Sequence, residues 1–214
     1  MSHCVFYSAC VVKAFEHLHE RRILYRDLKP ENLLLDPKGW LKITDMGLAK
    51  FTVSRTYTTC GTPDYFAPEI VRSTGHTHAV DWWTLGILIY ELLTGAPPFE
   101  GHPMERYKKI LNGVAKAPFP SKVFTPHAQN LVLSLCAQDP SERLPVRPGG
   151  VVQNLYTHPF YDFEKWSKLS AKKLQPPYVP NPKTKLEMFK NVAEPGEVAT
   201  YPYVDPGTGW DADF

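Results

Sequence analysis

The side chains in this sequence that are best suited to chemistry lie between residues 25 and 47. Asp27 and Lys29 are two positions apart, so in an extended loop both side chains point the same way. The carboxylate can accept the proton of a hydroxyl group, and the ammonium can bind a phosphate. Asn32 and Asp45 offer an amide oxygen and a carboxylate, which are ligands that Mg²⁺ accepts. The set provides one group for a hydroxyl proton, one for a phosphate and two for a metal ion.

A short β-hairpin is expected between the two candidate metal ligands. Residues 33–35 and 41–43 are brief, mainly apolar runs, and the Asp-Pro-Lys-Gly sequence at 36–39 is typical of a turn. Pairing of the two runs returns Asp45 to the side of Asn32. The hairpin therefore predicts that the two oxygen ligands lie together.

Residues 25–32 (Tyr-Arg-Asp-Leu-Lys-Pro-Glu-Asn), followed by Asp-Met-Gly at 45–47, resemble the catalytic loop and the metal-binding motif of protein kinases. The resemblance implies that Asp27 orients the substrate hydroxyl and accepts its proton. It also implies that Lys29 steadies the γ-phosphate of ATP. A polar loop of an unrelated fold is the alternative, and the downstream motifs described below disfavour it.

The resemblance also implies the cofactors, which are ATP and Mg²⁺. By this match Asn32 and Asp45 hold the metal ions, and Leu34 lies under the adenine. The sequence departs from the family at two positions, because Tyr25 stands where His is usual and Met46 stands where Phe is usual. Both are packing positions in the family, and methionine can fill such a position as an adaptable apolar side chain.

The composition is that of a folded globular protein with one substantial core, or one core with a tail. The chain has 214 residues, of which 43% are hydrophobic and 13% aromatic. The 24 basic and 22 acidic residues leave a formal net charge of +2. This balance gives no electrostatic reason to expect nucleic acid or a membrane surface as the main partner.

The four cysteines, at positions 4, 10, 60 and 136, are far apart, and no histidine lies at metal-ligand spacing from them. We expect reduced thiols rather than a disulfide framework or a zinc site. Cys60 lies close to Thr58 and could be a redox-sensitive group, although a small structural thiol is the simpler interpretation. With no secretory signal and no apolar run of about 18 residues, we expect a cytoplasmic protein without a membrane span.

The predicted fold is mainly α-helical (α+β), like the large C-terminal lobe of a protein kinase with a short hairpin at the catalytic loop and an extended C-terminal tail. An amphipathic helix is expected over residues 7–18, and a helix that is apolar on nearly every face over 79–94. Shorter helices are expected around residues 104–111 and from Thr125-Pro126 onward, an N-cap followed by proline at the first helical position.

Three polar residues belong to these predicted helices. His17 and His19 flank the end of the first helix, where we expect solvated side chains rather than metal ligands. Asp81 lies near the start of the apolar helix. By the kinase resemblance it hydrogen-bonds the backbone of the catalytic loop.

Residues 48–65 are rich in hydroxyl groups and resemble the activation and substrate-docking loop of kinases. By this resemblance Thr58 is the phosphorylation site, and Arg26 and Lys50 match the basic residues that pair with the phosphate. Thr62 matches the hydroxyl that bridges the catalytic carboxylate and ammonium. An ordinary loop threonine at position 58 is the alternative.

Ala67-Pro68-Glu69 resembles an element that kinases carry after this loop. A carboxylate in a folded core needs a partner, and Arg143 matches the residue that pairs with Glu69 in the family. This element and Thr62 argue against small-molecule phosphotransferases, which share the spacing between the catalytic Asp and Asn. Lys29 and Thr62 also favour transfer to serine or threonine rather than to tyrosine.

Glu91 lies near the end of the apolar helix, where a charge needs either solvent or a cationic ligand. In basophilic kinases, the residues that match Glu31 and Glu91 together receive an arginine two positions before the phosphorylated residue. The resemblance therefore implies protein substrates with basic residues before the serine or threonine. Two ordinary surface acids are the alternative.

From residue 176 onward the chain has seven prolines and few apolar clusters, so we expect a segment that is disordered or laid along a folded surface. It resembles the C-terminal tail of AGC-group kinases, a match that places Phe189 at the adenine side of the nucleotide. Residues 6–12 and 209–214 resemble cGMP-dependent protein kinases. The expected organisation is a large lobe over residues 1–160 and a tail over 161–214.

The sequence has no G-x-G-x-x-G loop and no strand with the lysine that kinases use to position the phosphates. We therefore expect a part of a longer kinase, whose partners would include the missing small lobe or a regulatory domain. A Ser/Thr protein kinase is the leading hypothesis. The alternative for the chain as it stands is a non-catalytic lobe that acts as a protein-interaction module.

Overall fold

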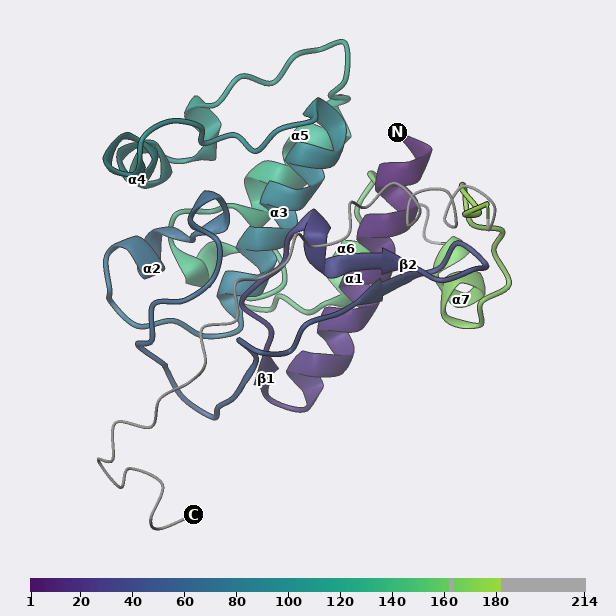
Figure 1. The fold of residues 1–214 in the computed structure, drawn as a ribbon, viewed down its shortest axis with the longest axis horizontal. Helices are drawn as coiled ribbons and strands as arrows, with labels where there is room; N and C mark the ends of the chain where they lie inside the picture. The colour runs from purple at the N-terminus through teal and green to yellow at the C-terminus, as the bar shows by residue number, and fades with distance from the viewer. Residues whose placement is uncertain (162–163, 182–214) are drawn as a thin grey trace, which may run out of the picture. The chain divides into compact units, whose positions relative to one another are not determined.

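A computed structural model describes residues 1–161 and 164–181, and helices make up most of the regular structure (Figure 1). The α-helices are α1 (Ser2–Glu20), α2 (Pro68–Val71), α3 (Ala79–Thr94), α4 (Pro103–Asn112), α5 (Pro126–Leu135), α6 (Gln153–Tyr156) and α7 (Lys165–Ser170). Short 3₁₀-helices are η1 (Pro30–Asn32), η2 (Pro63–Tyr65), η3 (Val114–Lys116) and η4 (Pro140–Glu142). The strands are β1 (Ile23–Leu24), β2 (Leu33–Leu35), β3 (Leu41–Ile43) and β4 (Lys50–Phe51). The predicted fold class, mainly α-helical with a hairpin after the loop, is confirmed.

Helix α3 is the centre of the core and packs against α1 and α5 (Figure 1). Every residue from Ala79 to Tyr90 is buried, as expected for a helix that is apolar on nearly every face. Gly86 permits the close approach of α5, because a Cβ at this position would lie only 2.4 Å from the Sγ of Cys136. The helix ends at Gly95, whose φ of +87° is a left-handed conformation that glycine adopts without strain.

Helix α1 begins earlier and ends later than the predicted range of 7–18. Cys4, Ser8, Val11 and Phe15 are all buried, and their spacing continues one face of the helix toward its N-terminus. The prediction relied on large apolar side chains, so it did not include a first turn whose buried residues are partly small. Burial of this face against α3 determines the length of the helix.

Two small antiparallel sheets flank the loop that carries Asp27. Strands β2 and β3 form the predicted hairpin, with Leu33 opposite Ile43. The carboxylate of Asp36 closes the turn by accepting hydrogen bonds from the backbone N–H groups of Lys38 and Trp40. Strand β1 pairs with β4, so the chain after the hairpin returns to the start of the loop.

An ion pair in the core joins α2 to the segment after η4. The Nη1 and Nη2 atoms of Arg143 lie 2.6 and 2.7 Å from Oε1 and Oε2 of Glu69. Arg143 is fully buried and also donates hydrogen bonds to the carbonyl oxygens of Ala79 and Ala137. The predicted partner of Glu69 is therefore confirmed, and the pair connects three segments that are far apart in the sequence.

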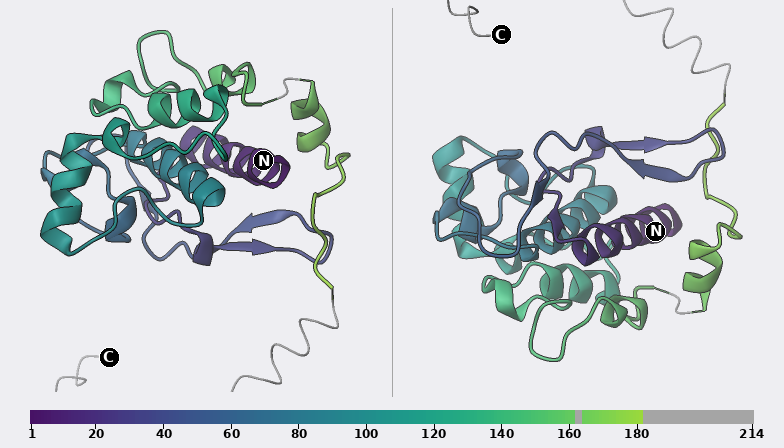
Figure 2. Two further views of the ribbon diagram at one scale, coloured as in Figure 1. Left: turned by 90° about the horizontal axis from the view of Figure 1, so that it is seen from above. Right: turned by 90° about the horizontal axis from the view of Figure 1, so that it is seen from below.

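The packed chain continues beyond Phe160. Helix α7 buries Trp166 and Leu169, and a compact unit extends from Met1 to Pro180. In both views of Figure 2 the segment after α7 passes the turn of the β2–β3 hairpin, where a Cβ on Gly39 would lie 2.1 Å from the carbonyl oxygen of Tyr178. The division into a lobe over 1–160 and a tail over 161–214 stays a prediction.

All four cysteines lie in the described part of the chain, and each is a free thiol, as predicted. Burial raises the pKa of Cys10 to about 11 and that of Cys4 to about 12, so both are packed as neutral groups. Within residues 1–161 and 164–181, no helix has the length and apolar character needed to cross a membrane.

Candidate active site

Asp27 is the centre of a polar cluster in the loop between β1 and η1. Its Oδ1 accepts a hydrogen bond from the Thr62 hydroxyl at 3.1 Å, and its Oδ2 accepts hydrogen bonds from Lys29 Nζ and Asn32 Nδ2 at 2.8 Å each. The residue is only 7% exposed. An ionised carboxylate has about four lone-pair positions, so these three donors leave one position for a further donor. That position lies on Oδ1, where a hydroxyl group can be oriented.

Lys29 links the same carboxylate to the segment that precedes η2. Its Nζ lies 2.8 Å from Asp27 Oδ2 and 3.1 Å from Thr62 Oγ1. The lysine side chain is 24% exposed, so the ammonium is fixed by two partners and still reaches solvent. The structure therefore brings together three of the predicted site residues, and each contacts the other two.

A buried carboxylate on α3 holds the backbone of this loop. Asp81 Oδ2 accepts the backbone N–H of Tyr25 at 3.0 Å, and Oδ1 accepts that of Arg26 at 2.9 Å. Arg26 has a φ of +70°, a left-handed conformation that costs a residue with a side chain about 1 kcal/mol or more. The two hydrogen bonds stabilise this conformation, and the predicted role of Asp81 is confirmed.

His19 completes this arrangement, and the prediction that it is solvated is wrong. Its Nε2 lies 2.7 Å from Asp81 Oδ2, and its side chain is 9% exposed. The ring stacks on Phe15 and meets Trp82 edge-on. The signal was present in the sequence, because His19 follows Phe15 by four residues and so lies on the buried face of α1.

The hairpin brings Asn32 and Asp45 together. The backbone N–H and the hydroxyl of Thr44, the residue before Asp45, donate to the carbonyl oxygen of Asn32 at 2.9 and 3.1 Å. Asn32 Nδ2 donates to the carbonyl oxygen and Oδ2 of Asp27, which leaves the amide oxygen for a ligand. Asp45 is exposed. These two oxygen donors fit Mg²⁺, which commonly takes one or two protein ligands and completes its shell with waters and phosphate oxygens.

Two apolar side chains beside these ligands are exposed. Leu34, on β2, is 55% exposed, and Met46 is 49% exposed. The expectation that Met46 packs is wrong for the described residues, because they leave about half of its surface exposed. Leu34 retains the apolar surface expected of a residue that contacts a flat ring.

Two basic side chains lie along the segment that carries Thr58, which is itself exposed. Arg26 Nε donates to the carbonyl oxygen of Leu48 at 2.8 Å, while its Nη1 is buried without a partner among the described residues. Lys50 Nζ donates to Thr56 Oγ1 at 2.8 Å. Both predicted cations thus donate hydrogen bonds to this segment. One of them, Arg26, also has a nitrogen without an acceptor among the described residues.

The predicted substrate-binding acids lie around one tyrosine. The Tyr65 hydroxyl donates a hydrogen bond to Glu91 Oε2. Burial, this hydrogen bond and the negative charges of Glu91, Glu31 and Asp64 all raise the pKa of Tyr65. Sequence reasoning included Glu31 and Glu91 but missed Tyr65 and Asp64. The available signal was that Asp64 and Tyr65 closely follow Thr62 in the predicted substrate-docking loop.

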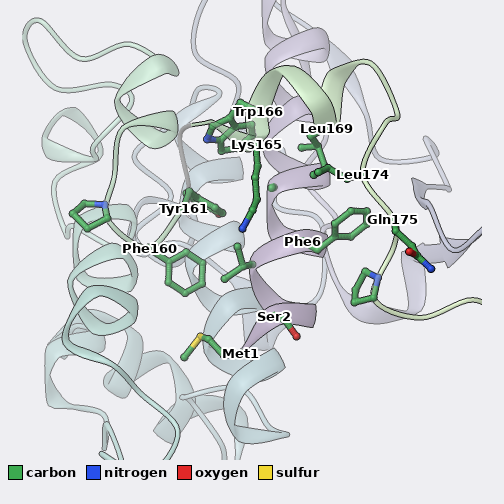
Figure 3. A pocket seen from close by; sticks show the side chains of 14 residues that line it. Met1, Ser2, Phe6, Phe160, Tyr161, Lys165, Trp166, Leu169, Leu174 and Gln175 are labelled. Atoms are coloured by element: carbon green, nitrogen blue, oxygen red, sulfur yellow. The ribbon is translucent and has the colours of Figure 1, made fainter.

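A cavity of about 580 Å³ lies between the N-terminal half of α1 and α7 (Figure 3). Its lining is mostly apolar and includes Phe6, Phe160, Trp166 and Leu169. None of the polar cluster around Asp27 contributes to it. The candidate active site therefore does not coincide with this cavity.

A protein kinase domain model matches residues 1–161, which include the loop, the hairpin and the ion pair described above. The chain belongs to the protein kinase family. This kinase is 44% identical over 212 residues to cGMP-dependent protein kinase, isozyme 2 forms cD5/T2, of Drosophila melanogaster. The alignment covers 98% of the kinase chain and 22% of the relative.

Two further relatives support this placement. Human cGMP-dependent protein kinase 2 is 43% identical over 212 residues, covering 98% of this kinase and 27% of the relative. The cAMP-dependent protein kinase type 3 of Saccharomyces cerevisiae is 47% identical over 176 residues, covering 82% of this kinase and 43% of the relative. The kinase is thus a member of the AGC group of Ser/Thr protein kinases. It spans about a quarter of the length of the cGMP-dependent relatives.

Proposed function

We propose that this kinase chain supplies the catalytic loop, the metal ligands and the substrate-docking surface of a Ser/Thr protein kinase. The reaction is transfer of the γ-phosphoryl group of ATP to a serine or threonine of a basic protein substrate. The observation that carries the proposal is that Lys29, Thr62 and Asn32 occupy three acceptor positions of the Asp27 carboxylate and leave one on Oδ1.

In this proposal Asp27 acts as the proton acceptor. The substrate hydroxyl donates to the remaining position on Oδ1, which aims its oxygen at the phosphorus, and the proton passes to the carboxylate as the phosphoryl group is transferred. Thr62 and Lys29 keep the carboxylate in one orientation. Lys29 also places a positive charge beside the transferred phosphoryl group, where negative charge must be neutralised.

The proposed cofactors are ATP and Mg²⁺. Asn32, through its amide oxygen, and Asp45, through its carboxylate, would hold the metal. Bound Mg²⁺ neutralises charge on the phosphate oxygens of the nucleotide. Leu34 offers its exposed side chain to the adenine, and the proposed contact of Phe189 with the nucleotide lies outside the described residues.

The proposed substrates carry an arginine two positions before the phosphorylated residue. Glu31 is exposed and Glu91 is partly exposed, and both act electrostatically on the same tyrosine hydroxyl, which supports one shared binding site for a cation. Thr58 is the proposed activating phosphorylation site, with Arg26 and Lys50 as partners of the phosphate. A cytoplasmic location, expected because the sequence shows no secretory signal and no long apolar run, stays a prediction.

The decisive experiment replaces the matching 212 residues of human cGMP-dependent protein kinase 2 with this chain and measures phosphorylation of a basic peptide. We expect turnover in the range of about 1–100 s⁻¹ that is typical of kinases. An Asp27→Asn variant of the chimera, matched in size and unable to accept the proton, should lose nearly all of it. An inactive but folded chimera would contradict the catalytic proposal.

A non-catalytic interaction module is the second candidate for the 214-residue chain by itself. The exposed apolar surface of Leu34 and Met46 favours it, because a partner could cover this surface. Peptide binding distinguishes a surface that recognises the arginine of a substrate from one that binds proteins without sequence preference. The chain should bind a peptide with arginine two positions before serine more tightly than its alanine variant, and Glu91→Ala should remove the difference.

A further inference from the structure

An unpartnered histidine lies next to the proposed phosphorylation segment. His76 forms an isolated antiparallel bridge with Thr56, with N–H···O distances of 3.0 and 2.9 Å between the two backbones. His76 is 4% exposed, and its Nε2 is buried without a hydrogen-bond partner among the described residues. A buried polar nitrogen without a partner costs about 1–3 kcal/mol, so this atom needs an explanation.

A second unpartnered nitrogen belongs to Arg26, whose Nη1 is also buried without an acceptor in the described chain. The charges of Arg26 and Lys50 both act on His76, and Lys50 Nζ donates to Thr56, the bridge partner of His76. Three nitrogen-bearing side chains from three segments therefore converge at one end of the activation segment. They bring positive charge and donors, and two of them, Arg26 and His76, each have one buried nitrogen without an acceptor among the described residues.

The sequence order relates this cluster to Thr58. Thr56 points inward and is 3% exposed, whereas the next residue, Tyr57, is 68% exposed and packs its ring over Gly75. Thr58 is only two residues from Thr56, whose backbone pairs with that of His76, so a phosphate on Thr58 would be attached close to this bridge. Thr58 is exposed and therefore accessible to a modifying enzyme.

We propose that His76 is a third donor of the site that receives the phosphate of phosphorylated Thr58, together with Arg26 and Lys50. A phosphate monoester has three acceptor oxygens, and the cluster offers one nitrogen from each of three side chains. This inference rests on the proposed role of Thr58 and extends it. It makes the stabilising effect of phosphorylation depend on the protonation of a histidine.

The groups around His76 determine the direction of this dependence. Burial and the positive charges of Arg26 and Lys50 lower the pKa of His76, while Glu69 on α2 and Asp81 on α3 oppose this effect. His76 is therefore neutral at pH 7 without the phosphate. A phosphate dianion at Thr58 adds a negative partner and raises the pKa of the imidazole. The extra stabilisation is full below the pKa of His76 in the unmodified chain and is lost as pH rises through the higher pKa of His76 in the phosphorylated chain.

The test compares the chain carrying phosphothreonine at position 58, incorporated during synthesis, with the unmodified chain between pH 5.5 and 8. We expect phosphorylation to raise the Tm by about 2–4 °C more at the low end than at the high end. ¹⁵N chemical shifts of His76 report its proton uptake, and ³¹P shifts report the separate titration of the phosphate. His76→Gln keeps an N–H donor but cannot titrate, so the gain should become independent of imidazole protonation.

His78→Gln is the matched control, because His78 is another histidine whose pKa is lowered by burial, and it is not part of the bridge. In this variant the gain in Tm on phosphorylation should keep the pH dependence that it has in the unmutated chain. A pH-dependent gain that His76→Gln leaves unchanged would overturn the role of His76 and leave the Thr58 site standing. In that case a water molecule is the partner of Nε2, and a void of about 20 Å³ beside Arg26 and His76 is large enough for one.

Absence of any gain, with Arg26→Ala equally without effect on the phosphorylated chain, would overturn both the inference and the proposed phosphate site. Loss of the gain in Arg26→Ala, together with a pH dependence that follows the His76 shifts, would support both. The two failures are therefore distinguishable by the Arg26 variant.

Discussion

The Thr62 hydroxyl lies 3.1 Å from Asp27 Oδ1, and its oxygen also lies 3.1 Å from Lys29 Nζ. The hydroxyl thus donates to the carboxylate and accepts from the ammonium, although Thr62 is far from both in the sequence. This bridge connects the activation segment to the catalytic loop. The orientation of the proposed proton acceptor therefore depends on the position of the activation segment.

Loss of this bridge should reduce turnover. In the chimera that carries this chain, Thr62→Val keeps the shape of the side chain but removes the hydroxyl, so that Asp27 is held only through its Oδ2. A hydrogen bond to a charged group contributes about 1.5–3 kcal/mol, so we expect a decrease in kcat of about 10- to 100-fold. Thr62→Ser keeps the hydroxyl and should retain most of the activity. Equal activities of the valine and serine variants would contradict the prediction.

The buried pair of Glu69 and Arg143 should dominate the effect of single substitutions on stability. Glu69→Ala leaves the Arg143 guanidinium buried with an unpaired charge, and we expect a loss of about 3–5 kcal/mol in the free energy of unfolding. Urea denaturation followed by tryptophan fluorescence measures it. Glu142→Ala removes an exposed carboxylate from η4, next to Arg143 in the sequence, and should change the stability by less than about 0.5 kcal/mol.

Removal of the imidazole of His19 should loosen the backbone that Asp81 holds. His19→Phe preserves the stack on Phe15 but removes the donor 2.7 Å from Asp81 Oδ2. We expect faster hydrogen exchange at the backbone amides of Tyr25 and Arg26, whose acceptor is the same carboxylate.

His17→Phe is the control for this experiment, because His17 is exposed on the same turn of α1. It should leave the exchange of both amides unchanged. If His19→Phe also leaves them unchanged, Asp81 holds the loop without help from His19, and the positioning role of the histidine is wrong.

The stability of the chain should fall as the solution is made mildly acidic. Burial lowers the pKa values of His76, His78 and His158 below the usual 6.5. The unfolded chain therefore binds more protons than the folded chain once the pH falls below 6.5. The contribution of these neutral histidines to stability is full above about pH 6.5 and is lost as pH falls through their lower values in the folded state.

Urea denaturation at pH 7.5, 6.5 and 5.5 measures this effect. Each proton taken up on unfolding changes the free energy by up to about 1.4 kcal/mol per pH unit. His158→Gln should flatten the dependence, because its Nε2 position 3.0 Å from Asn130 tolerates an amide. His17→Gln, at an exposed site, should not. A stability that is constant from pH 7.5 to 5.5 is incompatible with three histidines whose pKa values are lowered in the folded chain.

Much of the fold followed from local patterns in the sequence. The apolar run of residues 79–94 predicted α3 to the residue, and Thr125-Pro126 predicted the start of α5, where the Thr125 hydroxyl accepts the backbone N–H of Ala128. The turn at 36–39 predicted the hairpin. Each of these signals acts between residues that are close in the chain, so the sequence contains the whole cause.

The chemistry of the site could also be predicted from the sequence, because it depends on residue types at short spacing. Asp27, Lys29 and Asn32 lie within one loop, and a hairpin of known register adds Asp45. The assignment of Thr62 to the same cluster came from the family resemblance. No spacing rule relates Thr62 to Asp27, which precedes it by 35 residues.

The tertiary structure alone decided which polar groups are buried and what they meet. His19 contacts Asp81, Tyr65 donates to Glu91, and the unpartnered nitrogen of His76 faces no acceptor among the described residues. These relationships depend on the packing of helices that are distant in sequence. A hydrogen bond forms over about 3 Å, whereas a sequence pattern specifies only the face of a helix. The residue types therefore determined the candidate reaction, and the packing around α3 determined how the loop that performs it is held.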